Sequence, residues 1–438
     1  MTLGLAATLV ADLAVIVGLA RLLGALSRRL GQPPVIGEII GGILLGPTLF
    51  HGAVTTTLFP AGVRPTLGVL ANIGVAVFMF LVGLEVDRNL LRGQGRIAAT
   101  VSLSALILPF ALGTLLALYL VGHHPTAHRL AFVLFVGTAM AVTAFPVLAR
   151  ILTDKGLIRT PIGGLALATA AVGDVVAWLL LAFVVALTDL GHDPWRVLLV
   201  VPYLAVMLWV VRPLLARLAA RHPATGRLAG VGVLLAVSVG LLLSAKATDW
   251  IGLHAIFGAF LLGVVVPRDG AVALREQVVP WIRRISSVLL LPVFFMVAGL
   301  NVDLSSVDLT GLGELALILL VAVGGKFAGG FLGARVNGVR VRHSVVLAVL
   351  INARGLTELI VLAVGLQVGV LDARLASLMI VTAVVTTAMT GVLLRVVYPE
   401  ERVRLDLASL EEATPADRAA RTSPTFRTPR PLHEESAS

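Results

Sequence analysis

The chain has no cysteine, and charged residues make up only 13% of its 438 positions. The first absence excludes disulfide bonds, thiol nucleophiles and cysteine-ligated metals. The second, with 58% hydrophobic residues and a mean hydropathy of +1.00, leaves more apolar surface than one soluble core can bury. A low aromatic content of 5% and many Ala, Val, Leu and Gly residues suit closely packed transmembrane helices, not short alternating barrel strands. We therefore expect an all-α polytopic membrane protein.

The apolar residues form thirteen runs near the roughly 20 residues that a helix needs to cross a bilayer. The runs lie near 3–23, 33–50, 66–86, 97–121, 129–152, 162–188, 195–219, 227–248, 253–267, 284–300, 312–334, 343–370 and 375–397. Most loop Lys and Arg residues fall in the odd-numbered loops, so the net charge of +10 reflects membrane topology and we expect no nucleic-acid partner. By the positive-inside rule, the N-terminus lies outside and the C-terminus in the cytoplasm.

Two pairs of segments indicate an internal repeat. "IGEIIGGILLGP" (36–47) matches "LHAIFGAFLLGV" (253–264), and "VFMFLVGLEVD" (77–87) matches "VFFMVAGLNVD" (293–303), at nearly the same offset. The second run thus pairs with the ninth, seven helices later, so the copies cross the membrane in opposite directions. Inverted repeats are typical of secondary transporters, which bind substrate near the midplane on broken helices.

Charged residues inside the apolar runs are the candidates for function, because an intramembrane charge is costly. They are Asp12, Glu38, Asp174, Lys326, Arg354 and Glu358. Asp174 is the only ionisable residue between Ile162 and Thr188, and Lys326 lies at a similar depth in its own run. One interpretation is a structural ion pair that locks two helices. The other is a carboxylate that binds either a proton or a metal cation, with burial and the nearby lysine acting oppositely on its proton affinity.

Two segments resemble breaks in helices. In "AVTAFPVLAR" (141–150), Pro146 removes a backbone N–H, and freed carbonyls together with the Thr143 hydroxyl are oxygen ligands for an alkali cation. In "NARGLTEL" (352–359), Gly355 weakens the helix; polar side chains at the same depth come from Asn352, Arg354 and Glu358. A plain proline kink is the alternative for the first segment. For the second, Arg354 and Glu358 at i, i+4 either neutralise each other or take part in an ion path.

The motifs "QPPVIGEIIGGILLGP", "FMFLVGLEVD", "AVTAFPVLARIL", "GDVVAW", "GLHAIFGAFLLGVVVP", "PVFFMVAGLNVD" and "INARGLTELIVLAVG" occur in this order between residues 30 and 397. Together they resemble the monovalent cation:proton antiporter-2 family, especially its cation/H+ exchanger branch. The resemblance implies thirteen helices, a homodimer, and a mobile core domain that slides against a dimerisation domain. It also implies that Asp174 binds the ion, that Thr143 belongs to a crossing of broken helices, and that Lys326 is the core lysine.

One position departs from the family pattern. Where the family usually has Asp, Asn or Gln before the aspartate, this chain has Gly173. Electrogenic members tend to carry two carboxylates, so a single one indicates electroneutral, one-for-one exchange. It also leaves Asp174 as the obvious partner of Lys326.

We therefore expect an antiporter of the cytoplasmic membrane that exchanges Na+ or K+ for H+ at Asp174 and Thr143, with neither enzymatic activity nor a cofactor. Residues 1–397 would form the transmembrane domain. Its core would comprise about 97–188 and 312–397, and its dimerisation scaffold about 3–86 and 195–300. Residues 398–438 are polar and would form a disordered cytoplasmic tail. The alternatives are a sodium-coupled carrier of an organic solute and a gated cation channel. "HHPTAH" (123–128) lies in an outside loop, and we do not expect it to bind a metal.

Overall fold

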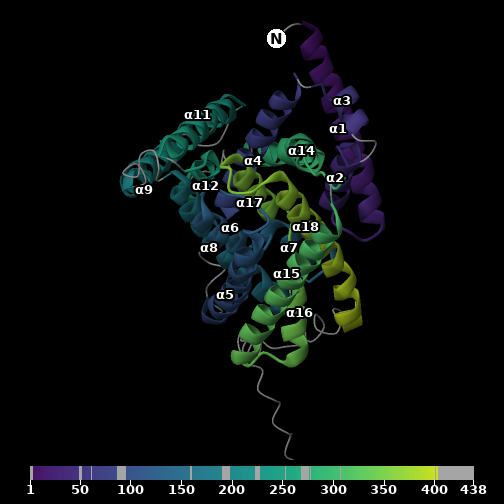
Figure 1. The fold of residues 1–438 in the computed structure, drawn as a ribbon. Coiled ribbons are helices and arrows are strands. Elements are labelled where there is room, and N and C mark those ends of the chain that lie inside the picture. Colours follow the sequence, from purple (N-terminus) through teal and green to yellow (C-terminus); the bar gives the residue numbers. More distant parts are fainter. Residues whose placement is uncertain are drawn as a thin grey trace, which may run out of the picture.

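The computed structural model is helical, with no strand in the residues that it describes: 3–48, 52–60, 62–85, 95–157, 160–189, 198–221, 227–251, 253–267, 276, 278–305, 307–399 and 401–402. The expected tail lies almost entirely outside these residues, as does Asp87 at the end of one repeat motif. The expected all-α class is confirmed (Figure 1).

The helices follow the apolar runs of the sequence. In the first half they are α1 (Leu3–Arg29), α2 (Pro34–Leu45), α3 (Ala53–Leu58), α4 (Arg64–Glu85), α5 (Gly95–Leu120), α6 (Arg129–Ala141), α7 (Phe145–Asp154), α8 (Pro161–Asp189), α9 (Val200–Val206), the π-helical η4 (Met207–Val211) and α10 (Arg212–Arg221). The second half contains α11 (Arg227–Ile251), α12 (Ala255–Val265), α13 (Val279–Ile285), the π-helical η6 (Ser286–Leu290), α14 (Leu291–Leu300), α15 (Leu309–Val336), α16 (Val341–Ile351), α17 (Leu356–Gln367) and α18 (Ala373–Val397).

Nine helical segments of the described part are long and apolar enough to cross a bilayer. The bent pair α16 and α17, at 42° to each other, makes a tenth, and α2, α6 and α12 are shorter apolar helices. Large apolar side chains stay exposed on the surface of the chain, for example Trp209 at 78% and Leu320 at 69%. A helix that is apolar all round belongs in lipid or in a core. The chain is therefore a multi-pass membrane protein, whereas the number of thirteen crossings stays a prediction.

Glycines bring two pairs of helices into backbone contact. A Cβ atom on Gly42 of α2 would lie 2.8 Å from the Cα atom of Gly299 on α14. One on Gly83 of α4 would lie 3.0 Å from the Cα atom of Gly263 on α12. Small residues allow this close approach between membrane helices. The second run thus crosses the tenth, and the third crosses the ninth, so the four runs that carry the repeat motifs pack in two pairs.

A second group of closely packed helices consists of α5, α6, α8, α15, α16 and α18. Helix α5 packs against α6, α8 and α15, while α16 packs against α15, α18 and α8. Helix α1 packs instead against α2 and α14, and α11 packs against α12. Figure 1 shows α5, α15 and α16 running together toward the lower end, with α1 and α11 on opposite sides of the upper part. The largest buried apolar cluster draws most of its members from the group around α5 and α15.

Candidate functional site

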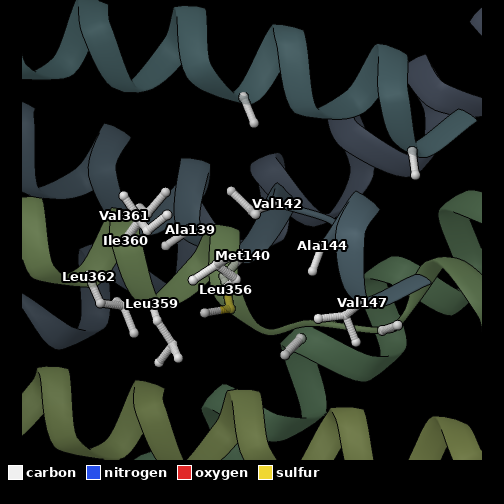
Figure 2. Close-up of a cluster of buried hydrophobic side chains, with 14 of the residues drawn as sticks. Ala139, Met140, Val142, Ala144, Val147, Leu356, Leu359, Ile360, Val361 and Leu362 are labelled. Carbon is white, nitrogen blue, oxygen red and sulfur yellow. The ribbon is translucent and has the colours of Figure 1, made fainter. Parts of the chain in front are cut away.

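Two interrupted helices meet in the middle of this second group. Residues 142–144 separate α6 from α7, and residues 352–355 separate α16 from α17. The two interruptions touch, because the backbone N–H of Ala144 donates a hydrogen bond to the carbonyl of Ala353 at 3.2 Å. Figure 2 shows the apolar side chains that pack around them, with Val142, Ala144 and Val147 from one segment and Leu356 from the other. This contact brings four helix ends to one place inside the protein.

The local sequence explains why each helix stops. Pro146 occupies the first turn of α7, where its missing N–H costs no hydrogen bond. Gly355 has φ 153°, a conformation that other residues rarely adopt. A Cβ atom there would also lie only 2.7 Å from Cγ2 of Val147. Both predicted breaks are confirmed, and the alternative of a proline kink within one continuous helix is wrong.

Lys326 reaches the crossing from α15, where its side chain is almost completely buried. Its ammonium group donates hydrogen bonds to the carbonyl of Ala141 and, at 2.6 Å, to Oγ1 of Thr143. Ala141 is the last residue of α6, so the lysine places a positive charge at the negative end of that helix. Lys326 and Thr143 are thus in direct contact in the structure.

Arg354 also binds the end of α6, from the opposite interruption. Its two terminal nitrogens donate to the carbonyls of Ala139 at 3.1 Å and Met140 at 2.8 Å. The same guanidinium forms a fully buried ion pair with Glu358, 2.5 Å away in the first turn of α17. The neutralising pair that the i, i+4 spacing predicts is therefore present. A role of this pair in an ion path stays a prediction.

Asp174 lies on α8 and is 5% exposed. Its carboxylate interacts with the charge of Lys326 and with the backbone N–H of Phe145, the first residue of α7. The positive end of a helix favours an anion at this place. Oδ1 of Asp174 has no hydrogen-bond partner among the described residues. The side chain thus keeps one oxygen available at the crossing.

Three further positions complete the surroundings. Asn352 is the C-cap of α16 and is buried, and the described residues give its Oδ1 no hydrogen-bond partner. A Cβ atom on Gly173, beside the aspartate, would meet only Oγ of Ser102, at an ordinary van der Waals distance of 3.5 Å. The Thr387 hydroxyl on α18 lies 2.6 Å from the carbonyl oxygen of Arg354 and 2.7 Å from that of Ala383 in its own helix, so these two acceptors share its one proton. The sequence analysis missed Thr387, whose signal is the run of buried hydroxyl residues in "TAVVTTAMT".

The other charged candidates lie elsewhere. Asp12 is on α1 and Glu38 is on α2, and these helices pack against each other and against α14, not around the crossing. In the part of the chain that the structure describes, no cluster of three or more His, Cys, Asp or Glu residues could hold a metal ion. The segment 123–128 instead places His124 in a buried contact between two carboxylates. The crossing therefore gathers Asp174, Thr143, Lys326, Asn352, Arg354 and Glu358, with Pro146 shaping its backbone.

Broken membrane helices that cross beside buried charges define a class of protein, the secondary transporters that bind substrate on interrupted helices. The transmembrane family described as "Sodium/hydrogen exchanger" matches residues 14–398. The chain is 38% identical over 402 residues to the Na(+)/H(+) antiporter NhaS4 of Synechocystis sp., a match that covers 89% of this chain and 97% of that protein. The chain belongs to the sodium/hydrogen exchanger family, and the resemblance seen in the sequence is confirmed.

Longer relatives and solved structures agree with this assignment. The chain is 38% identical to Cation/H(+) antiporter 17 of Arabidopsis thaliana over 399 residues, and 33% identical to K(+)/H(+) antiporter 1 of Saccharomyces cerevisiae over 396 residues. It spans 48% and 44% of their lengths. The sodium proton antiporter MjNhaP1 of Methanocaldococcus jannaschii superposes with a TM-score of 0.65 at 16% identity, covering 93% of this chain and all of the other. That likeness shows the shared fold.

Proposed function

We propose that the protein is an antiporter that exchanges a monovalent cation, Na+ or K+, for H+ across the cytoplasmic membrane. The observation that carries the proposal is the buried Asp174 carboxylate, which has one unpartnered oxygen at the crossing of two broken helices. The printed names of its relatives, which are Na(+)/H(+), K(+)/H(+) and cation/H(+) antiporters, support the same activity. All of these named relatives are transporters.

Competition at one carboxylate explains how a proton and a cation exchange. A protonated Asp174 is neutral and offers no charge to a cation, whereas the ionised form attracts one. Thr143 Oγ1 and the Ala141 carbonyl are oxygen atoms of the kind that hard cations accept. In this structure both oxygens accept hydrogen bonds from Lys326. The ammonium therefore has to leave Thr143 before a cation binds there, so we propose that Lys326 competes with the cation for this site.

The helix packing supports a moving core and a fixed scaffold. The core comprises 97–188 and 312–397, and the scaffold comprises 3–86 and 195–300. Most closely packed helix pairs lie within one of these two sets, whereas the contact of α18 with α2 joins the core to the scaffold. At their boundary, Gln367 contacts His254 at 2.7 Å and Asn72 at 3.3 Å through its side-chain amide. We propose that the core slides across this boundary in an inverted-repeat fold to give alternating access. We propose further that the scaffold forms a homodimer and that the N-terminus lies outside.

The decisive experiment replaces Asp174 in the reconstituted protein. Proteoliposomes with an internal pH dye receive Na+, K+ and Li+ in turn, with the membrane voltage clamped. Wild-type protein should respond to at least one cation with a pH change, and Asp174→Asn should abolish this response because the amide binds neither proton nor cation well. Asp12→Asn is the matched control, since it removes another buried carboxylate on a helix remote from the crossing.

The alternatives give different results in the same assay. A sodium-coupled carrier would take up Na+ only together with an organic solute. A gated channel would conduct the cation without moving protons. Exchange that survives in Asp174→Asn would contradict the proposed site, and a wild-type protein that responds to no cation would contradict the antiporter itself.

A further inference from the structure

A second buried cluster of charge lies at one end of the helix group around α5 and α15. His124, just after α5, is 2% exposed. Its Nδ1 lies 2.6 Å from Oδ2 of Asp372, and its Nε2 lies 3.4 Å from Oε2 of Glu314. Glu314 is on the first turns of α15 and is equally buried, and Asp372 is the N-cap of α18. One imidazole thus joins three elements through both of its ring nitrogens.

The groups around this imidazole are mostly acidic. His123 is the neighbouring base, with Nδ1 4.0 Å from Oε1 of Glu314 and a half-exposed side chain. Arg374, in the first turn of α18, is paired at 2.7 Å with Asp308, the N-cap of α15. The phenol ring of Tyr119 on α5 contacts His123, not His124. The two carboxylates that face His124 are therefore not neutralised by the nearby arginine, which has its own partner.

We propose that His124, Asp372 and Glu314 form a second proton-binding site, separate from the site at Asp174. When His124 is protonated, this second site holds the ends of α5, α15 and α18 together. Both ring nitrogens face carboxylate oxygens, and only the doubly protonated imidazolium can donate a hydrogen bond to both. A neutral imidazole leaves one nitrogen without a proton beside a carboxylate, which weakens the joint between the helices.

The position of this cluster links it to the crossing without being part of it. Glu314 precedes Lys326 on α15 by twelve residues, or about 18 Å of helix. Asp372 caps α18, whose Thr387 holds the Arg354 carbonyl about 22 Å further along. The cluster thus fastens the far ends of two helices that support the crossing. The loop charges predict that this end faces outside, so the external pH would set its protonation state.

Electrostatics favour the protonated form of His124 relative to a free histidine. Burial alone lowers the pKa of His124, but the hydrogen bond and the charge of Asp372, aided by Glu314, outweigh it and raise the pKa above its usual 6.5. Burial raises the pKa of Asp372, but the hydrogen bonds from His124 and from the Leu375 backbone outweigh it and bring the pKa below 3.8. The histidine therefore stabilises the fold fully below pH 6.5, and this contribution is lost as the pH rises through the raised value. The aspartate contribution is lost only at acidic pH.

Thermal unfolding of the full-length, detergent-solubilised protein across about pH 5.5 to 9 tests the proposal. His124→Gln should lower the unfolding temperature by on the order of 2 °C at the acidic end, and the difference from wild type should shrink as the pH rises. His128→Gln, an exposed histidine in the same loop, should show no such pH-dependent difference. A His124→Gln difference that is the same at every pH would overturn the proposal.

A second substitution keeps the test informative if His124→Gln folds poorly. Asn is as good an N-cap as Asp, so Asp372→Asn retains the cap of α18 while it removes the charge that faces the imidazole. As a single substitution, Asp372→Asn should remove most of the stability that the wild-type protein gains at acidic pH relative to alkaline pH. In the double variant, His124→Gln should add little further pH dependence. Undiminished pH dependence in Asp372→Asn would contradict the proposal. These readouts do not involve transport, so their failure leaves the proposed antiport activity untouched.

Discussion

Side chains satisfy several of the backbone carbonyls that the two broken helices leave free. The last carbonyls of α6 accept hydrogen bonds from Lys326 and Arg354, and the carbonyl of Arg354 accepts one from Thr387. An unpaired backbone group inside a membrane costs several kcal/mol. These side chains therefore help to make the interruptions possible.

Thr387 offers a test of this support. Thr387→Val keeps the shape of the side chain but leaves the Arg354 carbonyl unpaired, so we expect it to destabilise the protein by about 1–3 kcal/mol and to slow exchange. Thr390→Val is the matched control, because the Thr390 hydroxyl donates to the carbonyl of Thr386 in its own helix and, among the described residues, to no carbonyl of the crossing. Unfolding and proteoliposome exchange are measured for both. Equal effects of the two substitutions would show that Thr387 has no special role.

The sequence predicts the charged members of the site better than the hydroxyl members. Asp174 and Lys326 stand out because ionisable residues are rare in apolar runs. Thr387 does not, since most hydroxyls on a membrane helix bond to their own backbone, as Thr390 does. Which hydroxyl faces a distant carbonyl depends on how the helices pack. The same holds for His124, whose two carboxylates come from far along the chain.

At the scale of helices, the glycine contacts set how closely the scaffold packs. A Cβ atom on Gly83 would lie 2.2 Å from the carbonyl oxygen of Phe260, which is rigid backbone. We expect Gly83→Ala to separate α4 from α12 and to lower stability by about 1–3 kcal/mol. Gly68→Ala, on the same helix with nothing within 4 Å, should be neutral or slightly stabilising. Thermal unfolding compares the two, and a neutral Gly83→Ala would refute the close contact.

The sequence predicts some of the helical elements and misses others. The long apolar runs and the breaks at Pro146 and Gly355 follow from length, proline and glycine, which act locally. The π-helical segments Met207–Val211 and Ser286–Leu290 were not predicted. A shift from i→i−4 to i→i−5 hydrogen bonds leaves an apolar run looking the same, so the sequence holds no signal for it.

For the whole molecule, the net charge at the crossing bears on whether exchange depends on the membrane voltage. Asp174, Lys326, Arg354 and Glu358 sum to zero when all are ionised, and a bound proton or cation adds one charge in either case. We therefore expect wild-type exchange to be independent of membrane voltage. A Cβ atom at position 173 would make only an ordinary contact with Ser102, so we expect Gly173→Asp to be tolerated and to make exchange voltage-dependent, whereas the uncharged Gly173→Asn should not. The test is whether a clamped voltage alone, without an ion gradient, drives net exchange. Voltage-driven net exchange by the wild type would rule out one-for-one stoichiometry.

The crossing of α2 with α14 also constrains how the protein is made. Gly42 meets Gly299, a residue that emerges from the ribosome about 250 positions later. At 5–20 residues per second, that interval lasts roughly 13–50 s. During this time α2 lies in the membrane without its glycine partner. Biogenesis of the protein therefore requires that α2 stay without its contact to α14, in the lipid or beside the insertion machinery, until the second half of the chain arrives.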